Sequence, residues 1–224
     1  MIGLDHFSLV LGRKTVLRDV TLRPERGVLL ALCGPNGAGK TSILRALAGL
    51  TPGTTPADAR RTAYLAQNAH SNWALTVAQI AALGRIPHGD AGVDAVDRAL
   101  RRCGVEALRD APIDRISGGE ARRAMLARVF ATEPEMFLLD EPTADLDPAA
   151  SHAILRLLRE TAEAGAAVVV VLHAVELAAE YAHRVALVHR GQIVSDHAAD
   201  QVLPAAASLF GMRAGTGPRL LPLS

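Results

Sequence analysis

The segment GPNGAGKT, residues 34–41, combines glycines, a lysine and a threonine at a spacing suited to holding phosphate. It fits the pattern G-x-x-x-x-G-K-[ST] and lies between an apolar run and a helix-like segment, the context that this pattern needs. Backbone N–H groups of such a loop wrap a phosphate, Lys40 reaches the β and γ phosphates, and the Thr41 hydroxyl can ligate Mg²⁺. The predicted nucleotide-binding residues are Gly34, Pro35, Asn36, Gly37, Ala38, Gly39, Lys40, Thr41 and Ser42.

Two adjacent carboxylates, Asp140 and Glu141, end the apolar run at 136–140. Ligands gather at the carboxyl ends of the strands in an open parallel sheet. Asp140 is therefore placed to hold Mg²⁺ through water, and Glu141, which would point differently, could polarise an attacking water. Taken alone, the pair also fits an ordinary acidic exit from a strand.

Two further polar residues follow strand-like runs. His173 ends the apolar run at 166–173, and Gln67 follows the strand-like run at 62–66. Each one alone also fits a structural histidine or a surface amide. What matters for both residues is their order along the chain relative to the phosphate loop and the carboxylates.

The segment SGGE, residues 117–120, starts a helix-like stretch. Ser117 and Glu120 have the spacing of a capping box, in which each side chain satisfies a backbone N–H group at the helix start. A capping box asks nothing of the two positions between them, and a glycine inside a helix costs roughly 1 kcal/mol relative to alanine. Gly118 and Gly119 therefore need another reason.

Buried strands alternating with helices indicate an α/β fold with a mainly parallel sheet. The expected strands are 15–22, 28–33, 136–140 and 166–173, and the expected helices are 41–50 and 149–165. A final hairpin is expected at 184–194, with Arg190 and Gly191 at its turn. The chain is expected to form one domain, with an α/β core (1–67 and 134–210), an inserted helical subdomain (68–133) and a loose tail (211–224).

Composition narrows the function classes. The formal net charge is +1 and no long basic block occurs, which argues against a nucleic-acid partner. The two cysteines, Cys33 and Cys103, have no CxxC spacing and suit a reducing compartment. No run approaches the roughly 20 apolar residues that span a bilayer, and Asp5 stands where a signal peptide would be basic. We therefore expect a cytosolic protein.

Together, these motifs resemble the ATPase subunits of ABC transporters. Segment 34–41, Gln67, "ISGGE", "LLDEPT", "ADLD" and His173 correspond in order to the Walker A, Q-loop, signature, Walker B, D-loop and H-loop. The resemblance implies a P-loop NTPase fold with an N-terminal antiparallel β part and an inserted helical subdomain. It also implies two subunits that sandwich two ATP molecules head to tail.

The resemblance also implies a role for each matching residue. Glu141 would be the general base, His173 would contact the γ-phosphate, and Gln67 would sense Mg²⁺ and the attacking water. Asp147 would cross the dimer interface. The implied signature residues acting on the partner's nucleotide are Ser117, Gly118, Gly119 and Glu120, and the implied Mg²⁺ residues are Thr41, Gln67 and Asp140.

Two stretches, 75–90 (LTVAQIAALGRIPHGD) and 177–194, together with SGGE (117–120), are similar to ATPases of importers for iron-siderophores, haem and vitamin B12. Segment 83–88 alone also fits a helix end stopped by proline. The resemblance implies permease subunits on separate chains, indirectly a solute-binding protein, and a location on the inner face of the cell membrane.

The chain departs from the family pattern at two positions. Leu11 stands where an aromatic residue usually stacks on adenine, so we expect weaker discrimination between ATP and GTP. Glu120 replaces the usual signature glutamine; since a carboxylate repels phosphate, we expect it to turn back into the capping box.

Three alternatives remain beside a metal-chelate importer. One is the ATPase of a transporter for another solute, such as a metal ion or an amino acid, or of an exporter. Another is a soluble ABC ATPase acting on DNA or ribosomes, but the sequence has neither a long coiled-coil insertion nor a second cassette. The last is a regulatory subunit without turnover, against which Glu141 and His173 argue.

Overall fold

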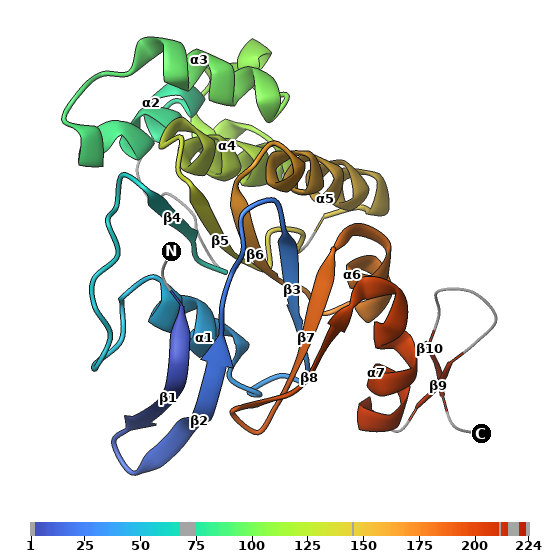
Figure 1. The fold of residues 1–224 in the computed structure, drawn as a ribbon. Helices are drawn as coiled ribbons and strands as arrows, with labels where there is room; N and C mark the ends of the chain where they lie inside the picture. Colours follow the sequence, from blue (N-terminus) through green and yellow to red (C-terminus); the bar gives the residue numbers. More distant parts are fainter. Residues whose placement is uncertain (1–2, 68–74, 145, 211, 215–219, 223–224) are drawn as a thin grey trace.

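The fold is that of a computed structural model, which describes residues 3–67, 75–144, 146–210, 212–214 and 220–222 (Figure 1). Its centre is a six-stranded sheet in which five neighbouring strands are parallel and the last is antiparallel. The order across the sheet is β4 (Thr62–Leu65), β5 (Met136–Asp140), β6 (Ala167–Val171), β3 (Leu29–Cys33), β7 (Arg184–His189) and β8 (Gln192–Ala198). The prediction of a mainly parallel α/β fold is confirmed.

The central strands are apolar because both faces of the sheet are covered. Every residue of β3, β5 and β6 is buried. Within β3, Leu29 and Ala31 belong to the core on one face, whereas Leu30 and Leu32 belong to the core on the other. Alternate side chains of a strand point to opposite faces, so a strand buried on both sides needs an unbroken apolar run.

Different elements cover the two faces. On one face lie α1 (Lys40–Leu47) and a separate antiparallel hairpin, which is the predicted N-terminal β part. This hairpin consists of β1 (Leu4–Leu11) and β2 (Lys14–Leu22). On the other face lie α4 (Gly118–Ala131), α5 (Pro148–Glu163), α6 (Val175–Tyr181) and α7 (Val202–Phe210).

The predicted hairpin at 184–194 is formed by β7 and β8. Its turn residues, Arg190 and Gly191, have φ values of 48° and 79°. Two successive residues with positive φ make a type I′ turn, whose twist matches that of the flanking strands.

Within the described part of 68–133, all regular structure is helical, apart from one isolated bridge between Thr76 and Pro112. The elements are α2 (Val77–Ala82), η1 (Leu83–His88), α3 (Val93–Arg102), η2 (Glu106–Leu108), η3 (Ile113–Arg115) and α4. Buried residues of α2, α3 and α4 share one continuous core with a face of the sheet. Residues 68–74 of the predicted insert lie outside the described residues.

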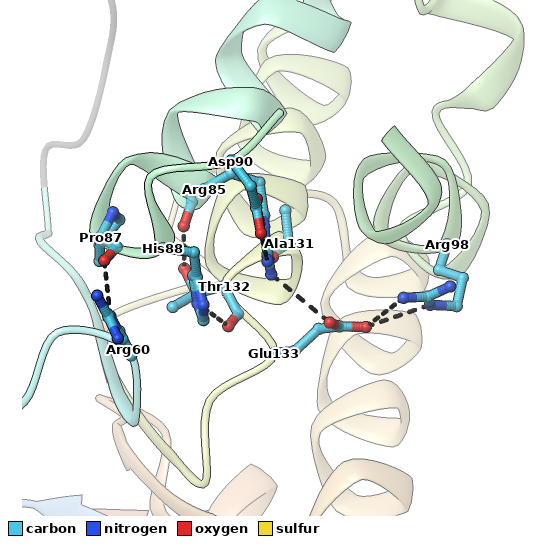
Figure 2. A network of polar contacts seen from close by, with 10 residues as sticks. Arg60, Arg85, Pro87, His88, Asp90, Arg98, Ala131, Thr132 and Glu133 are labelled. Carbon is cyan, nitrogen blue, oxygen red and sulfur yellow. Dashed lines mark hydrogen bonds and ion pairs between the residues drawn. The ribbon is translucent and has the colours of Figure 1, made fainter. Parts of the chain in front are cut away.

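The segment 83–88, read from the sequence as either a family motif or a helix end, forms the short helix η1 and is tied to the end of α4. The buried Arg85 donates to the carbonyl of Ala131 at 3.0 Å and pairs with Asp90 at 2.8 Å. His88 contacts the Thr132 carbonyl at 3.0 Å (Figure 2). A buried guanidinium with several partners fixes one orientation of a segment, so these contacts hold η1 against the end of α4.

The described part of the C-terminal tail contains two short strands. β9 (Met212–Ala214) and β10 (Leu220–Pro222) pair with each other in antiparallel register. Backbone pairing needs no side-chain pattern, and three-residue strands are too short to show one. Among the described residues, no helix is long and apolar enough to cross a membrane.

Candidate functional site

The phosphate loop connects β3 to α1 at the carboxyl edge of the parallel strands. Gly39 is the N-cap of α1 with a φ of 110°, and no side chain in the described part of the chain caps the helix start. At Gly34, an added Cβ would lie 2.1 Å from the carbonyl oxygen of Val188 on β7. Glycine is therefore required at both positions, and the uncapped N–H groups at the start of α1 suit an anion.

Lys40 is buried inside this loop. Its Nζ donates to the carbonyl oxygens of Gly34 and Pro35, at 2.7 and 3.0 Å. Burial lowers the pKa of Lys40, and the nearby Glu141 carboxylate acts in the opposite direction. An ammonium has three donors, so one remains for a phosphate oxygen once these two carbonyls are satisfied.

Asp140 ends β5 and has no exposed surface. Among the described residues, no hydrogen bond of ordinary geometry reaches either of its carboxylate oxygens. Burial raises the pKa of Asp140, and the nearby Thr41 side chain opposes this shift. Two buried, unsatisfied oxygens beside a hydroxyl are suited to Mg²⁺, which prefers oxygen ligands. The donor set therefore fits the cation that the sequence predicts.

Glu141 brings together residues that are distant in the sequence. Its Oε2 accepts a hydrogen bond from Nε2 of Gln67 at 2.8 Å, and its Oε1 lies 2.5 Å from Nε2 of His173. The Glu141 side chain is only 11% exposed, whereas that of His173 is 50% exposed. A carboxylate fixed between two side chains beside a phosphate loop is a candidate for proton transfer, and its role as general base stays a prediction.

These groups line one pocket of about 400 Å³. Its lining residues are Lys14, Val16, Asn36, Gly37, Ala38, Gly39, Lys40, Thr41, Ser42, Gln67, Glu141 and His173. Most of the predicted nucleotide-binding residues and all three predicted catalytic residues therefore lie around one cavity. Gly34, Pro35 and Asp140 are not among its lining residues. The carbonyls of Gly34 and Pro35 hold the lining residue Lys40, and Asp140 is buried.

The predicted capping box at the start of α4 is confirmed. Glu120 Oε2 accepts from the backbone N–H and the hydroxyl of Ser117, at 2.9 and 2.8 Å, and Ser117 Oγ accepts from the Glu120 N–H at 3.3 Å. These hydrogen bonds lower the pKa of Glu120. The residues 117–120 are absent from the lining of this chain's own pocket.

Asp147, expected at a dimer interface, is the N-cap of α5. Its Oδ1 accepts a hydrogen bond from the Ala150 N–H at 2.8 Å. This contact gives Asp147 a structural role within the chain and leaves its predicted role at an interface as a prediction.

Three residues around the site were not predicted from the sequence. Lys14 and Val16 line the pocket, whereas Leu11, predicted to cover adenine, is 50% exposed and pairs with Lys14 across the hairpin. Arg122, one turn into α4, donates to four carbonyls behind Glu141. Lys14 and Lys40 are the only lysines in the sequence, and Lys40 belongs to the phosphate loop, so the rarity of lysine was a signal for Lys14. For Arg122 there was no such signal, because nothing in the sequence distinguishes it from its neighbour Arg123.

A second hollow, of about 410 Å³, lies where α4 and α5 end. Four of its charged residues form two pairs, Arg98 with Glu133 and Arg26 with Glu135, and Arg102 donates to the Thr161 hydroxyl. None of the described residues of the predicted chemical motifs lines this hollow, so the pocket beside the phosphate loop is the candidate site.

Comparisons with known proteins agree with this geometry. A family described as "ABC transporter" matches residues 17–144. A protein named "Hemin import ATP-binding protein HmuV" from Rhodococcus jostii is 39% identical over 212 residues, covering 86% of this chain and 73% of that protein. A protein of the same name from Pseudomonas fluorescens is 37% identical, covering 91% and 89%.

Solved structures are similar over nearly the whole chain. The structure of an ATP-binding subunit of an ABC transporter has a TM-score of 0.78 and 25% identity, covering 93% of this chain and 94% of that one. A proposed metal-chelate-type ABC transporter in an inward-facing conformation has a TM-score of 0.84 at 21% identity, covering 99% and 97%. With the family match over 17–144 and relatives at 37–39% identity, this chain belongs to the ABC transporter family as an ATP-binding subunit.

Proposed function

We propose that this chain is the ATP-hydrolysing subunit of a membrane importer for haem or a related chelate, such as an iron-siderophore or cobalamin. The observation that carries the ATPase function is the Glu141 carboxylate, held between Gln67 and His173 beside the phosphate loop. The solute class rests on relatives named for hemin import and on the segments 75–90 and 177–194.

Hydrolysis transfers the γ-phosphoryl group of ATP to water, so a water oxygen bonds to the γ-phosphorus and ADP leaves with the bridging oxygen. Glu141 accepts the proton of the attacking water. Gln67 and His173 would orient this carboxylate, and His173, whose side chain is half exposed, would contact the γ-phosphate. Lys40 and the N–H groups at the start of α1 stabilise the charge that develops on the phosphate oxygens.

Thr41, Asp140 and Gln67 would hold Mg²⁺, with Asp140 acting through water. When bound, the cation neutralises phosphate charge. Asp140 contributes a buried carboxylate whose oxygens have no ordinary hydrogen bond among the described residues. Its charge is costly without a cation and favourable with one.

The signature residues Ser117, Gly118, Gly119 and Glu120 would act on the nucleotide of a second copy of the chain, and Asp147 would lie at that interface. The proposed domain organisation would allow two copies of the chain to close on ATP in this way. Residues 1–67 and 134–210 form the nucleotide-binding core, 68–133 form a helical subdomain that passes motion to permease subunits, and 211–224 form a tail. The chain would work on the cytoplasmic face of the membrane, with a solute-binding protein acting through the permease.

The first experiment tests the base. Glu141→Gln should abolish steady-state hydrolysis while ATP still binds and traps a dimer, because the amide keeps the size of the side chain but cannot accept the proton. Glu106→Gln, at an exposed carboxylate outside the site, is the matched control and should leave hydrolysis unchanged. Unchanged turnover in Glu141→Gln would exclude the assigned role.

The second experiment tests the solute. The chain should co-purify with a permease, and ATP hydrolysis by the reconstituted complex should be stimulated by haem with its binding protein. Iron-siderophore and cobalamin systems form the comparison set. Stimulation by an amino acid or a free metal ion instead would assign the chain to another importer class.

A further inference from the structure

Arg122 connects the helix of the signature segment to the backbone that carries the proposed general base. It lies in α4, four residues after Gly118. Its Nε donates to the Pro142 carbonyl at 3.1 Å and its Nη1 to the Gln67 carbonyl at 3.1 Å. Its Nη2 donates to the carbonyls of Asp140 and Glu141, at 3.2 and 2.5 Å. A planar guanidinium offers five donors in a rigid fork, so one side chain fixes four carbonyl oxygens together.

Glu141 needs such support because its backbone is left-handed. Its φ is 50°, a region that residues other than glycine rarely occupy, and such a conformation persists only when its surroundings hold it. The carbonyls before, at and after this residue all accept from Arg122. Both peptide planes that flank the Glu141 Cα are thereby fixed, and with them the direction of its side chain.

The same guanidinium also holds the backbone of Gln67, whose side chain donates to the Glu141 carboxylate at 2.8 Å. Donor and acceptor of that hydrogen bond therefore share one anchor. Gln67 follows β4 and Glu141 follows β5, and these strands are neighbours in the sheet. Arg122 contributes a further tie at the ends of these strands, on the side of α4.

We propose that Arg122 is a positioning residue for ATP hydrolysis: it holds Glu141 in its left-handed conformation and in register with Gln67. This inference rests on the proposed function, because it concerns the carboxylate assigned as general base. Arg122 is not among the residues that line the nucleotide pocket. Its loss should therefore change turnover and leave the binding of ATP intact.

The test uses the full chain with Arg122→Gln and Arg122→Lys. We expect kcat to fall about tenfold to hundredfold in Arg122→Gln, since a displacement of about 1 Å in a catalytic group has effects of that size. The kcat of Arg122→Lys should lie between that of the unsubstituted chain and that of Arg122→Gln, because an ammonium keeps the charge but lacks the planar fork. The Kd for ATP, measured by calorimetry, should stay within about twofold of the unsubstituted chain.

Arg101→Gln is the matched control, because Arg101 is an exposed arginine on α3 that pairs with Glu106, and its removal should leave kcat unchanged. Unchanged kcat in both Arg122 variants would overturn the proposal. So would a loss of ATP binding that matches the loss of kcat, since that pattern indicates a general disruption of the site. Arg122→Lys keeps the test valid if Arg122→Gln fails to fold.

A double-mutant cycle separates this proposal from the role of Glu141 itself. In single-turnover assays on a Glu141→Gln background, adding Arg122→Gln should slow the residual hydrolysis by less than about twofold, because the group that Arg122 positions is already disabled. Equal losses in both backgrounds would overturn the positioning role and leave Glu141 as the base. Normal hydrolysis in Glu141→Gln alone would overturn the proposed function, and with it this inference.

Discussion

The two signature glycines, Gly118 and Gly119, should be replaceable in the isolated chain and indispensable for hydrolysis. Neither has a positive φ. A Cβ added at Gly118 would meet no described residue within 4 Å, and one at Gly119 would lie 3.6 Å from Leu146 Cδ2, an ordinary contact. Among the residues that the structure describes, nothing therefore requires glycine at these two helical positions.

The size of the effect follows from helix propensity. Each glycine-to-alanine change in a helix stabilises by about 0.5–1 kcal/mol when the alanine has room. The double variant Gly118→Ala/Gly119→Ala should therefore gain about 1–2 kcal/mol, which corresponds to a rise in Tm of about 2–8 °C for a chain of this length. The rate of hydrolysis should fall by roughly a hundredfold, because two added methyl groups would prevent the γ-phosphate of a second chain's nucleotide from approaching the start of α4.

Calorimetry without nucleotide gives the Tm, and a phosphate-release assay gives the turnover. Gly104→Ala is the matched control: its Cβ would also meet open space, but Gly104 has a φ of 65°, so alanine there should lower the Tm. Gly119→Asp should leave ATP binding to the single chain largely intact and block dimer closure. A lower Tm in the double alanine variant, or unchanged hydrolysis, would refute the reasoning.

The remaining predictions concern the buried carboxylate of Asp140, the packing of η1 against α4 and the predicted contact of Leu11 with adenine. Burial raises the pKa of Asp140 above its usual 3.8, so its charge destabilises the fold at neutral pH, and this penalty disappears below pH 3.8, where the carboxyl is protonated both folded and unfolded. Asp140→Asn should therefore raise the Tm at neutral pH without Mg²⁺, with a gain that shrinks toward low pH, and abolish hydrolysis; a lower Tm at neutral pH would contradict this. Gly84→Ala should destabilise by about 1–3 kcal/mol in urea unfolding, because its Cβ would lie 2.0 Å from the Arg128 carbonyl oxygen, and a loss below that range would show that η1 can shift. Leu11→Tyr should increase the preference for ATP over GTP in competition binding by about 0.5–1.5 kcal/mol, and an already strong preference with Leu11 would count against it.

Much of the fold could be predicted because its signals are local. The apolar runs predicted β3, β5 and β6 to within one or two residues at each end, and Arg190 with Gly191 marked a turn. The pairing of β9 with β10 was not predicted, since these strands pair through backbone groups without a side-chain pattern. Likewise, nothing in the composition of segment 83–88 indicated that Arg85 is buried and bonded to the end of α4.

By itself, the sequence determined which groups gather at the carboxyl edge of the sheet. The reason is that residues directly after parallel strands lie at that edge whatever the rest of the chain does. The tertiary structure alone decided how these groups contact one another. Gln67 and His173 meet on Glu141, which holds a left-handed conformation, and Arg122 secures that backbone from another helix. Such contacts join residues from 18 to 74 positions apart, and they depend on how helices pack on the sheet rather than on any pattern along the chain.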